Sequence, residues 1–271
     1  MAPRLSIIIV TYNSSREIEA CLASLVRHPP AATHDVTIVD NRSQDGTLEL
    51  VRANWPGVRT VQADGNGGFA RGNNIGIRQT ESDLVLLLNP DTVVGNGAID
   101  ALVTALDARP DSAAAGPRLI DASGRAELSF GRMVGPWAEL RQKLLVQGHG
   151  RRLPVVSGLV NRMTRRPRQV DWVSGACLLV RRADAMAVGL LDERYFMYLE
   201  DVDFCAALRA HGRTILFEPA AVVTHLRGQS RRSASAPTDR AYRRSQVAFY
   251  EKHHPRWAGV LKRYLRARGR L

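Results

Sequence analysis

Short apolar runs alternate with amphipathic stretches along the first part of the chain. The runs are rich in Val, Ile and Leu and lack polar alternation, which is typical of strands buried on both faces of a sheet. They predict strands at residues 5–10, 36–39, 58–62 and 84–88. Apolar residues at helical spacing predict helices at residues 18–25 and 48–53 and a short helix ending at residue 77. This alternation predicts an α/β fold with a mostly parallel open sheet and helices on both faces.

The pattern changes in the second part of the chain. Periodicity is weak over residues 123–170, where Gly, Pro and Arg are scattered, and this predicts an insertion or a flexible excursion. Beyond it we expect strands at 175–180, 214–217 and 220–223, a helix closing near residue 211, and final helices at 239–251 and 255–268. The expected organisation is one domain at 1–228, comprising 1–117, a basic insertion at 118–170 and 171–228, followed by a basic helical tail at 229–271.

Polar side chains gather where three of the predicted strands end. They are Thr11-Tyr12-Asn13 after the first strand, Asp40-Asn41 after the second, and Asn89-Pro90-Asp91 after the run at 84–88. Open parallel sheets bind ligands in the crevice beyond the carboxyl ends of their strands. The sequence therefore predicts a ligand site at this edge of the sheet.

Composition excludes several classes of protein. The chain has 271 residues, of which 45% are hydrophobic, as in ordinary globular domains and unlike disordered or fibrous chains. Its apolar runs are too short to span a bilayer. Three widely spaced cysteines, Cys21, Cys177 and Cys205, indicate a reducing, cytosolic compartment and no disulfide scaffold.

The formal net charge of +12 is concentrated in two segments. Residues 118–170 carry a net charge of +8 and residues 226–271 one of +11, whereas 1–117 and 171–225 carry −4 and −3. Such clusters are typical of proteins that bind nucleic acid or anionic lipids. Because the strand-end clusters lie in the acidic segments, the basic charge favours binding to an anionic membrane surface over a nucleic-acid activity.

Two candidate metal ligands each have a second interpretation. The carboxylate of Asp91 could hold a hard divalent cation that in turn binds phosphate oxygens. It could equally cap a helix beginning near Gly95. His225 follows an apolar run and could bind a metal or a phosphate, although a lone His is more often structural.

Three acids, Glu200, Asp201 and Asp203, stand close together at a predicted helix start. The helix dipole favours acidic residues there, which explains one or two of them. Aromatic residues surround the cluster, and an apolar environment raises the pKa of a carboxyl and suits it to general-base catalysis. Both interpretations remain open from the residues alone.

A glycine-rich turn at 65–70 loosely matches the G-x-G-x-x-A fingerprint of dinucleotide-binding proteins. It follows the third strand, whereas the turn after the first strand contains no glycine. Tight turning and close helix packing therefore explain these glycines better than a nicotinamide site does.

Taken together, six segments resemble the motifs of the family 2 glycosyltransferases, in the family's order. They are residues 6–13, 39–46, 66–76, 88–91, 175–176 and 200–203, and the match runs from Leu5 to about Gly228. Each motif is modest alone, but the ordered set is specific. The resemblance implies a GT-A fold and a nucleotide-diphosphate sugar as donor.

The resemblance also implies roles for individual residues. The nucleotide-sugar pocket would involve Thr11, Tyr12, Asn13, Asp40, Asn41, Gly68, Arg71, Asn89 and Asp91, with Asp40 bonded to a pyrimidine base. Asn89 replaces the first acid of the family's D-x-D motif, so Asp91 would hold Mg²⁺ or Mn²⁺, with His225 as an extra ligand. Asp201 would be the catalytic base. Glu200 would orient the acceptor, and Trp172 and Gly175 would border its site.

The mechanism implied by the resemblance is a single displacement. Asp201 takes the proton of an acceptor hydroxyl as that oxygen attacks the anomeric carbon, so the configuration inverts. The Asn-Pro-Asp turn, the Glu-Asp-Val-Asp-Phe block and a distal His-x-x-Gly resemble bacterial rhamnosyltransferases of cell-surface polysaccharide assembly. This implies dTDP-L-rhamnose as donor and a saccharide or polyprenyl-pyrophosphate-linked acceptor, used by a cytoplasmic enzyme peripheral to the inner face of the membrane.

Three other functions remain possible on the residues alone. A basic nucleic-acid-binding α/β protein predicts salt-sensitive duplex binding. An NAD-type oxidoreductase predicts dinucleotide binding at residues 65–70. A degenerate transferase would bind a nucleotide sugar without using it. The sugar-transferase hypothesis predicts no nucleic-acid partner and the release of a nucleoside diphosphate from its donor.

Overall fold

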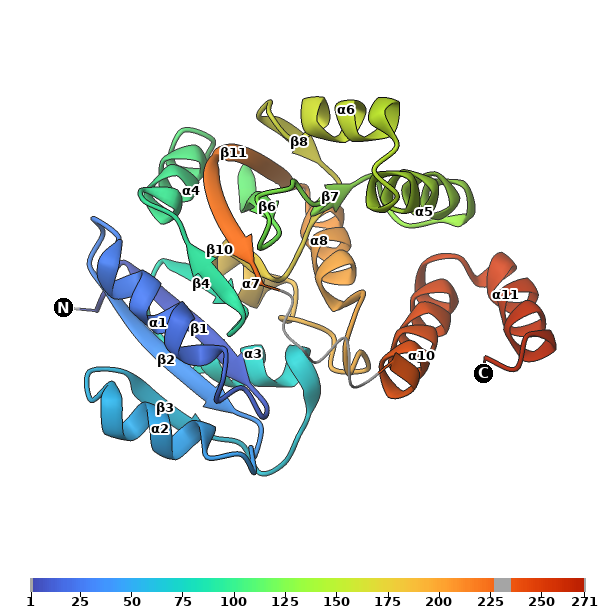
Figure 1. Ribbon diagram of the computed structural model, residues 1–271. Helices are drawn as coiled ribbons and strands as arrows, with labels where there is room; N and C mark the ends of the chain where they lie inside the picture. Colours follow the sequence, from blue (N-terminus) through green and yellow to red (C-terminus); the bar gives the residue numbers. More distant parts are fainter. Residues whose placement is uncertain (1, 227–234, 271) are drawn as a thin grey trace.

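The computed structural model describes residues 2–226 and 235–270, and most of its strands join one large sheet (Figure 1). The strands are β1 (Leu5–Thr11), β2 (His34–Asp40), β3 (Arg59–Gln62), β4 (Leu84–Leu88), β5 (Thr92–Val94), β6 (Ser112–Ile120), β7 (Phe130–Gly131), β8 (Arg168–Val170), β9 (Trp172–Val173), β10 (Cys177–Arg181) and β11 (Thr214–His225). The helices are α1 (Ile18–Arg27), α2 (Thr47–Asn54), α3 (Gly68–Arg78), α4 (Ala98–Asp107), α5 (Pro136–Gly150), α6 (Pro154–Met163), α7 (Arg182–Ala187), α8 (Glu200–Ala210), α10 (Ser235–His253) and α11 (Pro255–Ala267).

The large sheet has the order β3-β2-β1-β4-β10-β6-β11-β5, and β8 pairs with β11. The four strands predicted from the first apolar runs lie together and are parallel. β10 enters between β4 and β6 and is antiparallel to both, while β11 is parallel to β6. The two runs predicted at 214–217 and 220–223 form one strand, β11, with a break in register between Glu218 and Val222.

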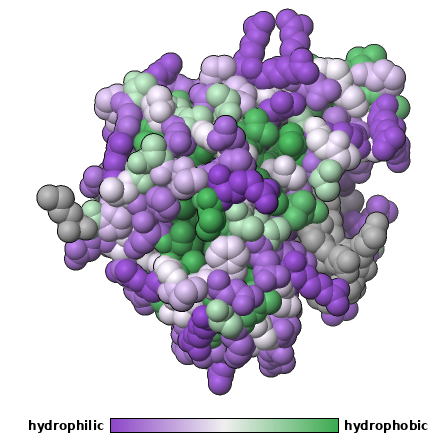
Figure 2. Space-filling view, turned by 60° about the vertical axis from the view of Figure 1, so that its left-hand side comes forward, coloured by the Kyte–Doolittle hydropathy of each residue, from purple (hydrophilic) through white to green (hydrophobic). Residues whose placement is uncertain are grey.

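Alternate residues of the central strands enter two separate cores, one on each face of the sheet. Ile7 and Ile9 of β1 point into the core covered by α1 and α4, whereas Ile8 and Val10 point into the core that includes residues of α3, α8 and α10. On the face shown in Figure 2, apolar side chains form patches separated by polar and charged ones. The predicted α/β fold with helices on both faces is thus confirmed.

Residues 123–170 contain regular structure, so the alternative of a flexible excursion is wrong, while the insertion stays a prediction. They include the helices α5 and α6, which begin at Pro136 and Pro154, positions where a missing N–H costs no helical hydrogen bond. The pattern was weak because these helices bury few residues, only Gly148 in α5 and Val160 in α6. The division predicted at 117/118 falls inside β6.

Helix α10 packs against the rest of the molecule. Phe249 and Tyr250 are buried in the core that also contains α8. The hydroxyl of Tyr250 donates to Oε2 of Glu139 in α5 at 2.9 Å, and Oγ of Ser245 donates to the carbonyl oxygen of Met197 at 2.7 Å. This part of the predicted tail is therefore integrated into the fold. The boundary predicted at 228/229 lies outside the described residues.

The cysteines are buried and form no disulfide. Burial raises the pKa of the Cys21 and Cys205 thiols to about 12, so both are protonated and unreactive at neutral pH. Within residues 2–226 and 235–270, no helix combines the length and apolar character needed to cross a membrane.

Candidate active site

The register of the sheet brings the ends of β1, β2 and β4 together. Thr11 at the end of β1 pairs with Asp40 at the end of β2, and Ile9 pairs with Leu88 at the end of β4. The polar clusters that follow these strands therefore share one edge of the sheet. This is the arrangement that the sequence predicted.

The turn before β10 reaches the same edge because β10 runs opposite to β4. Cys177, its first residue, pairs with Leu88, and the amide of Asn89 donates to the carbonyl oxygen of Ala176 at 2.9 Å. The Asn89-Pro90-Asp91 turn is thus joined directly to the segment that contains Gly175.

Asp40 is fully buried and holds the turn that follows β2. Its Oδ1 accepts a hydrogen bond from the Thr11 hydroxyl at 2.9 Å, and its Oδ2 accepts one from the Ser43 amide at 2.9 Å. Oγ of Ser43 accepts one from the Asn13 amide at 2.9 Å. Both carboxylate oxygens are engaged within the protein, so we assign Asp40 to shaping this turn. A direct bond to a pyrimidine base stays a prediction.

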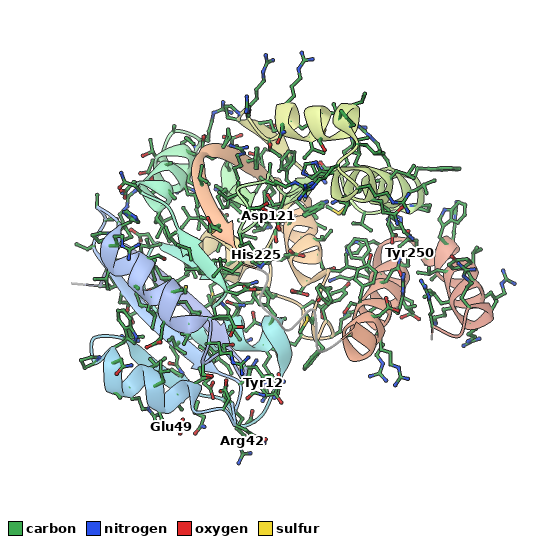
Figure 3. All side chains as sticks on the ribbon, in the orientation of Figure 1. Tyr12, Arg42, Glu49, Asp121, His225 and Tyr250 are labelled. Carbon is green, nitrogen blue, oxygen red and sulfur yellow. The ribbon has the colours of Figure 1, made fainter. Side chains whose placement is uncertain are left out.

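Tyr12 and Asn13 form the accessible part of the predicted nucleotide pocket. The Tyr12 ring is about half exposed. Asn13 has a φ of 50°, a left-handed conformation that Asn tolerates better than most residues, and its Oδ1 accepts a bond from the Gln44 amide at 2.8 Å. Figure 3 shows Tyr12 and Arg42 at the edge where β1 and β2 end. A planar aromatic side chain at this edge could stack on a nucleotide base.

The glycine-rich turn allows close packing at the start of α3. Gly68 has a φ of 80°, and a Cβ there would lie 2.0 Å from the carbonyl oxygen of Phe196. The Phe69 amide donates to that same oxygen at 3.0 Å, while Nδ2 of Asn41 donates to the Gly68 carbonyl at 3.0 Å. These contacts support the packing interpretation of residues 65–70 over the dinucleotide fingerprint.

Asp201, in the first turn of α8, faces the segment before β10. The amide of Gly175 donates to its Oδ2 at 2.8 Å, and the amide of Val202 donates to its Oδ1 at 2.8 Å. Asp201 as a whole residue is partly buried. Since Ala176, the next residue after Gly175, is bonded to Asn89, the structure brings Asp201 to the strand-end site.

Glu200 and Asp201 form a coupled acidic pair. Burial, together with the nearby Asp201 charge, raises the pKa of Glu200 well above its ordinary value. Burial also raises the pKa of Asp201, but the amides of Gly175 and Val202 oppose this by stabilising its charged form. The pair therefore takes up a proton at a higher pH than exposed carboxyls do, and the two backbone amides favour the charged form of Asp201.

The chain enters α8 through two residues in a left-handed conformation. Tyr198 has a φ of 71° and Leu199 one of 67°, and neither residue type favours that region. Such conformations cost about 1–3 kcal/mol each and are retained where the surrounding structure enforces them, often at functional sites. Here they set the direction in which Glu200 and Asp201 leave the loop.

Asp203 has a structural role. It is 2% exposed, and its carboxylate contacts Lys252 at 2.8 Å and His253 at 2.6 Å, both from α10. The Tyr195 hydroxyl donates to its Oδ1 at 3.2 Å. Of the three acids in the predicted cluster, this one joins α8 to α10 and is not available to a substrate.

Asp91 and His225 lie next to each other at the β5–β11 pair. Thr92 pairs with His225, and the Leu226 amide donates to the carbonyl oxygen of Asp91 at 2.8 Å. Oδ1 of Asp91 lies 3.3 Å from Nε2 of His225. The alternative role of Asp91 as a helix cap is wrong, because β5 intervenes and Gly97 occupies the N-cap position of α4.

Glu127 lies on the other side of the His225 ring, with its Oε2 3.5 Å from Nδ1. Burial lowers the pKa of His225, but the contacts with Asp91 and Glu127 outweigh it and raise that pKa to about 9. The isolated protein thus carries a protonated imidazole between two carboxylates. Figure 3 shows His225 at the end of β11.

The side chains of Asp91 and His225 fit a divalent cation that is also bound by the phosphates of a substrate. Asp91 offers a carboxylate oxygen and His225 an imidazole nitrogen, while a carboxylate on the far ring nitrogen is typical of metal-binding histidines. In the described part of the chain, no three His, Cys, Asp or Glu side chains are grouped closely enough to hold a metal by themselves. Substrate phosphates and water would complete the coordination, as they commonly do for Mg²⁺.

Two predicted site residues have other contacts in the structure. Trp172 is buried, and its indole N–H donates to the carbonyl oxygen of Arg132 at 2.9 Å. We therefore place it among the residues that support the site and not on an open acceptor surface. Arg71 forms an ion pair with Asp64 at 2.9 Å, and both side chains are well exposed.

Glu127 was missed by the sequence analysis. It lies in the connection between β6 and β7, close to the isolated bridge between Ile120 and Ala126. Pairing of β6 with β11, which sets Ile120 against Thr224, brings this connection to His225. Its local sequence shows no motif, so only the long-range pairing of two strands could have revealed it.

Gly175 gives a direct test of how Asp201 is positioned. A Cβ at Gly175 would lie 3.1 Å from the Phe69 ring and 3.3 Å from Cβ of Asp201, so Gly175→Ala should displace the carboxylate. For the reaction in which the resemblance makes Asp201 the base, we expect kcat to fall roughly 10- to 100-fold, because displacements of about 1 Å have effects of this size. Gly158→Ala in α6, where a Cβ would meet nothing within 4 Å, is the matched control. Equal kcat values for the two variants would contradict this role.

Comparisons of sequence place the chain among sugar-transferring enzymes. A family model described as "Glycosyltransferase like family 2" matches residues 3–259. N-acetylglucosaminyl-diphospho-decaprenol L-rhamnosyltransferase of Mycobacterium tuberculosis is 32% identical over 270 residues, which cover 95% of this chain and 87% of that protein. Rhamnosyltransferase WbbL of Escherichia coli is 26% identical over 247 residues, covering 84% and 85% of the two chains.

Solved structures share the fold. The mannosyltransferase PcManGT from Pyrobaculum calidifontis, in complex with GDP-Man and Mn²⁺, gives a TM-score of 0.64 at 17% identity, covering 97% of this chain and 69% of that one. GalNAc-T7 with UDP, GalNAc and Mn²⁺ gives a TM-score of 0.61 at 15% identity, covering 83% of this chain and 43% of that one. The predicted GT-A type of fold is confirmed. With the family model matching nearly the whole chain, the protein belongs to the glycosyltransferases of the family 2 type.

Proposed function

We propose that the protein is an inverting, metal-dependent glycosyltransferase. It transfers L-rhamnose from dTDP-L-rhamnose to a hydroxyl of a saccharide acceptor carried on a polyprenyl pyrophosphate, in the synthesis of cell-surface polysaccharide. The observation that carries the proposal is the hydrogen bond from the Gly175 amide to Asp201, which holds a carboxylate at the edge where the nucleotide-binding strands end. The two rhamnosyltransferase relatives support the sugar and, for one of them, the lipid-linked acceptor.

Asp201 is the proposed general base. In its ionised form, which the amides of Gly175 and Val202 stabilise, it accepts the proton of the acceptor hydroxyl while that oxygen bonds to the anomeric carbon. Glu200, beside it at the start of α8, would orient the acceptor. The C–O bond to the nucleoside diphosphate breaks on the opposite face, so one displacement inverts the configuration.

The nucleotide would bind over the ends of β1 and β2. Thr11, Tyr12 and Asn13 would line the base and ribose region, on the turn that Asp40 holds in place. Asn41 and Gly68 would fix the adjoining glycine-rich turn, and Arg71 could leave Asp64 to approach the diphosphate.

Asp91 and His225 would hold Mg²⁺ or Mn²⁺ together with the diphosphate, next to Asn89. When bound, the cation supplies positive charge for the departing phosphate oxygens. Glu127 would orient the imidazole of His225 through its Nδ1. The Mn²⁺ in two structural neighbours of the same fold supports a divalent metal here.

The proposed place of action is the inner face of the cytoplasmic membrane. A lipid-linked acceptor lies in the bilayer, so an enzyme that uses it gains from staying at that surface. The clustered positive charge of the chain supports binding to anionic lipids, at about 1 kcal/mol for each basic residue near the surface.

Turnover of a panel of donors tests the proposal. The protein is incubated with dTDP-L-rhamnose, UDP-N-acetylglucosamine or GDP-mannose, with Mg²⁺ or Mn²⁺ and polyprenyl-pyrophosphate-linked N-acetylglucosamine. We expect nucleoside diphosphate release from dTDP-L-rhamnose alone, and a product of inverted anomeric configuration by NMR. Consumption of another donor would refute rhamnose, and retention of configuration would refute the single displacement. If no donor is used, the enzymatic proposal fails.

A further inference from the structure

Helix α5 exposes an apolar stripe that the fold does not use. Trp137, Leu140 and Leu144 are 78%, 50% and 60% exposed, and they occupy positions i, i+3 and i+7, which share one face of a helix. Another side of α5 makes the internal contacts, since Glu139 bonds to Tyr250 of α10. The helix is therefore fixed in place while its apolar stripe faces solvent.

Helix α6 repeats this arrangement. Val155 is 85% exposed and Leu159, one turn later, is also exposed, whereas Val160 is fully buried. Leu153, just before the helix, is exposed as well. The helix pair α5–α6 is tied to the connection between β6 and β7, because Nε2 of His149, at the end of α5, lies 2.9 Å from the carbonyl oxygen of Ala126.

Helix α11 carries the same spacing of apolar residues. Trp257, Val260 and Tyr264 are about half exposed and again occupy positions i, i+3 and i+7. Nε2 of His254, just before α11, lies 2.7 Å from the carbonyl oxygen of Val134, just before α5. Helices α5 and α11 thus begin side by side, and each has a Trp in its first turn.

Positive charge surrounds these apolar residues. From residue 140 to 170 the sequence contains eight Lys or Arg and no Asp or Glu. The basic residues of α5, α6 and the turn joining them are exposed: Arg141, Lys143, Arg151, Arg152 and Arg162. Figure 1 shows α5, α6 and α11 on the side of the molecule away from α1 and α2.

We propose that the outward faces of α5, α6 and α11 form a surface that binds an anionic lipid bilayer. Exposed Trp, Leu and Val side chains enter the boundary between headgroups and acyl chains, and the surrounding Arg and Lys contact anionic headgroups. Trp is the residue that favours this boundary most, because its ring is apolar and its N–H is polar. A second copy of the chain is a poorer occupant, because two such faces would bring like charges together.

The surface is connected to the proposed site through one helix. α5 bonds to α10 through Glu139, and Ser245 of α10 bonds to Met197 in the loop that leads into α8. A bilayer bound by α5 would therefore lie one helix away from the loop that positions Asp201. This inference gives a surface to the membrane association proposed above and rests on that part of the proposed function.

Vesicle binding of the full chain tests the surface without any sugar donor. The vesicles contain equal parts of phosphatidylglycerol and phosphatidylethanolamine, and the variant combines Trp137→Ser, Leu140→Ser and Leu144→Ser. We expect its partition coefficient in co-sedimentation to fall roughly tenfold or more, since burial of apolar side chains sets much of the affinity. Binding of the unaltered chain should also weaken strongly at about 0.5 M salt and on phosphatidylcholine alone.

Matched controls separate this surface from general effects. Val26→Ser with Met186→Ser removes exposed apolar side chains on α1 and α7 and should leave binding unchanged. Thermal unfolding of the triple variant should match that of the unaltered chain, because the stripe contributes no core contacts. Equal vesicle binding by the triple variant and the unaltered chain would overturn the proposal, as would a dimer in solution that the triple variant abolishes. Loss of vesicle binding with donor use retained would support the surface, independently of the sugar that is transferred.

Discussion

Asp201→Asn is expected to lower kcat for sugar transfer by about a thousandfold, within the 10²–10⁴ range of general-base catalysis. The amide has nearly the same size, and its oxygen can still accept the hydrogen bond from the Gly175 amide, while the bond from the Val202 amide is lost. It cannot take the proton of the acceptor hydroxyl. Nucleoside diphosphate binding, measured by calorimetry, should stay close to that of the unaltered protein, which separates loss of chemistry from loss of structure.

Asp203→Asn, two residues along the same helix, is the matched control. This carboxylate contacts Lys252 and His253 and is buried, so its loss should reduce the free energy of unfolding by about 3–5 kcal/mol. The kcat of the folded fraction should change far less than in Asp201→Asn. If the two variants lost kcat equally, Asp201 would not be the base.

The pH profile gives a second readout on the same residue. Burial raises the pKa of Asp201, so the carboxyl takes up its proton at a higher pH than an exposed Asp does. The base form is present above that pH and is lost as the pH falls through it. We therefore expect kcat/KM to fall as the solution becomes more acidic, at a pH above the usual pKa range of Asp. Because Glu200 and Asp201 titrate together, this acid limb of the profile belongs to the pair. In Asp201→Asn this limb should disappear from the residual activity.

Asp91→Asn is expected to remove Mn²⁺ binding in the presence of nucleoside diphosphate and to lower kcat/KM by roughly 100-fold or more. An amide oxygen is a weaker ligand than a carboxylate for a hard cation. The substitution also takes a negative charge away from His225, which lies 3.3 Å from Oδ1 of Asp91. Binding of Mn²⁺ is followed by electron paramagnetic resonance, independently of turnover.

Asp121→Asn tests whether the loss of any carboxylate in this region would remove Mn²⁺ binding. Asp121 follows β6 near the end of β11, but its Oδ1 is occupied by the amides of Ser123 and Arg125 in its own turn. Figure 3 shows it close to His225 in that view. We expect Mn²⁺ binding to survive in Asp121→Asn. Full Mn²⁺ affinity in Asp91→Asn would exclude Asp91 as a ligand.

The parallel half of the sheet could be predicted because each of its central strands is a continuous apolar run. β4, with the sequence LVLLL, is buried along its whole length. β6 could not be predicted, because its sequence SAAAGPRLI has residues with weak strand preference. Its small residues are explained by neighbours distant in sequence, since a Cβ at Gly116 would lie 2.5 Å from Cβ of Val173.

The candidate site likewise contains residues whose position the sequence could predict and residues whose position it could not. Thr11, Asp40 and Asp91 follow apolar strands, so the sheet geometry alone predicts that they share an edge. Glu127 reaches His225 only through the pairing of β6 with β11, and a local pattern holds no information about that pairing. Asp203 looks equivalent to Asp201 in the sequence, and only the position of α10 shows that Asp203 is held in a buried ionic contact, whereas Asp201 bonds to the segment before β10.

The place of β10 in the sheet determines the order in which the molecule can be completed. β10 is flanked by β4 and β6, yet it follows both in the chain, after α5 and α6. While the ribosome makes the intervening residues, the apolar strand β4 has an unpaired edge, and β6 has neither of its partner strands, β10 and β11. Open apolar edges promote association between chains. We therefore expect the nascent protein to be most prone to aggregation until Cys177–Arg181 has emerged, the interval in which a chaperone would help most.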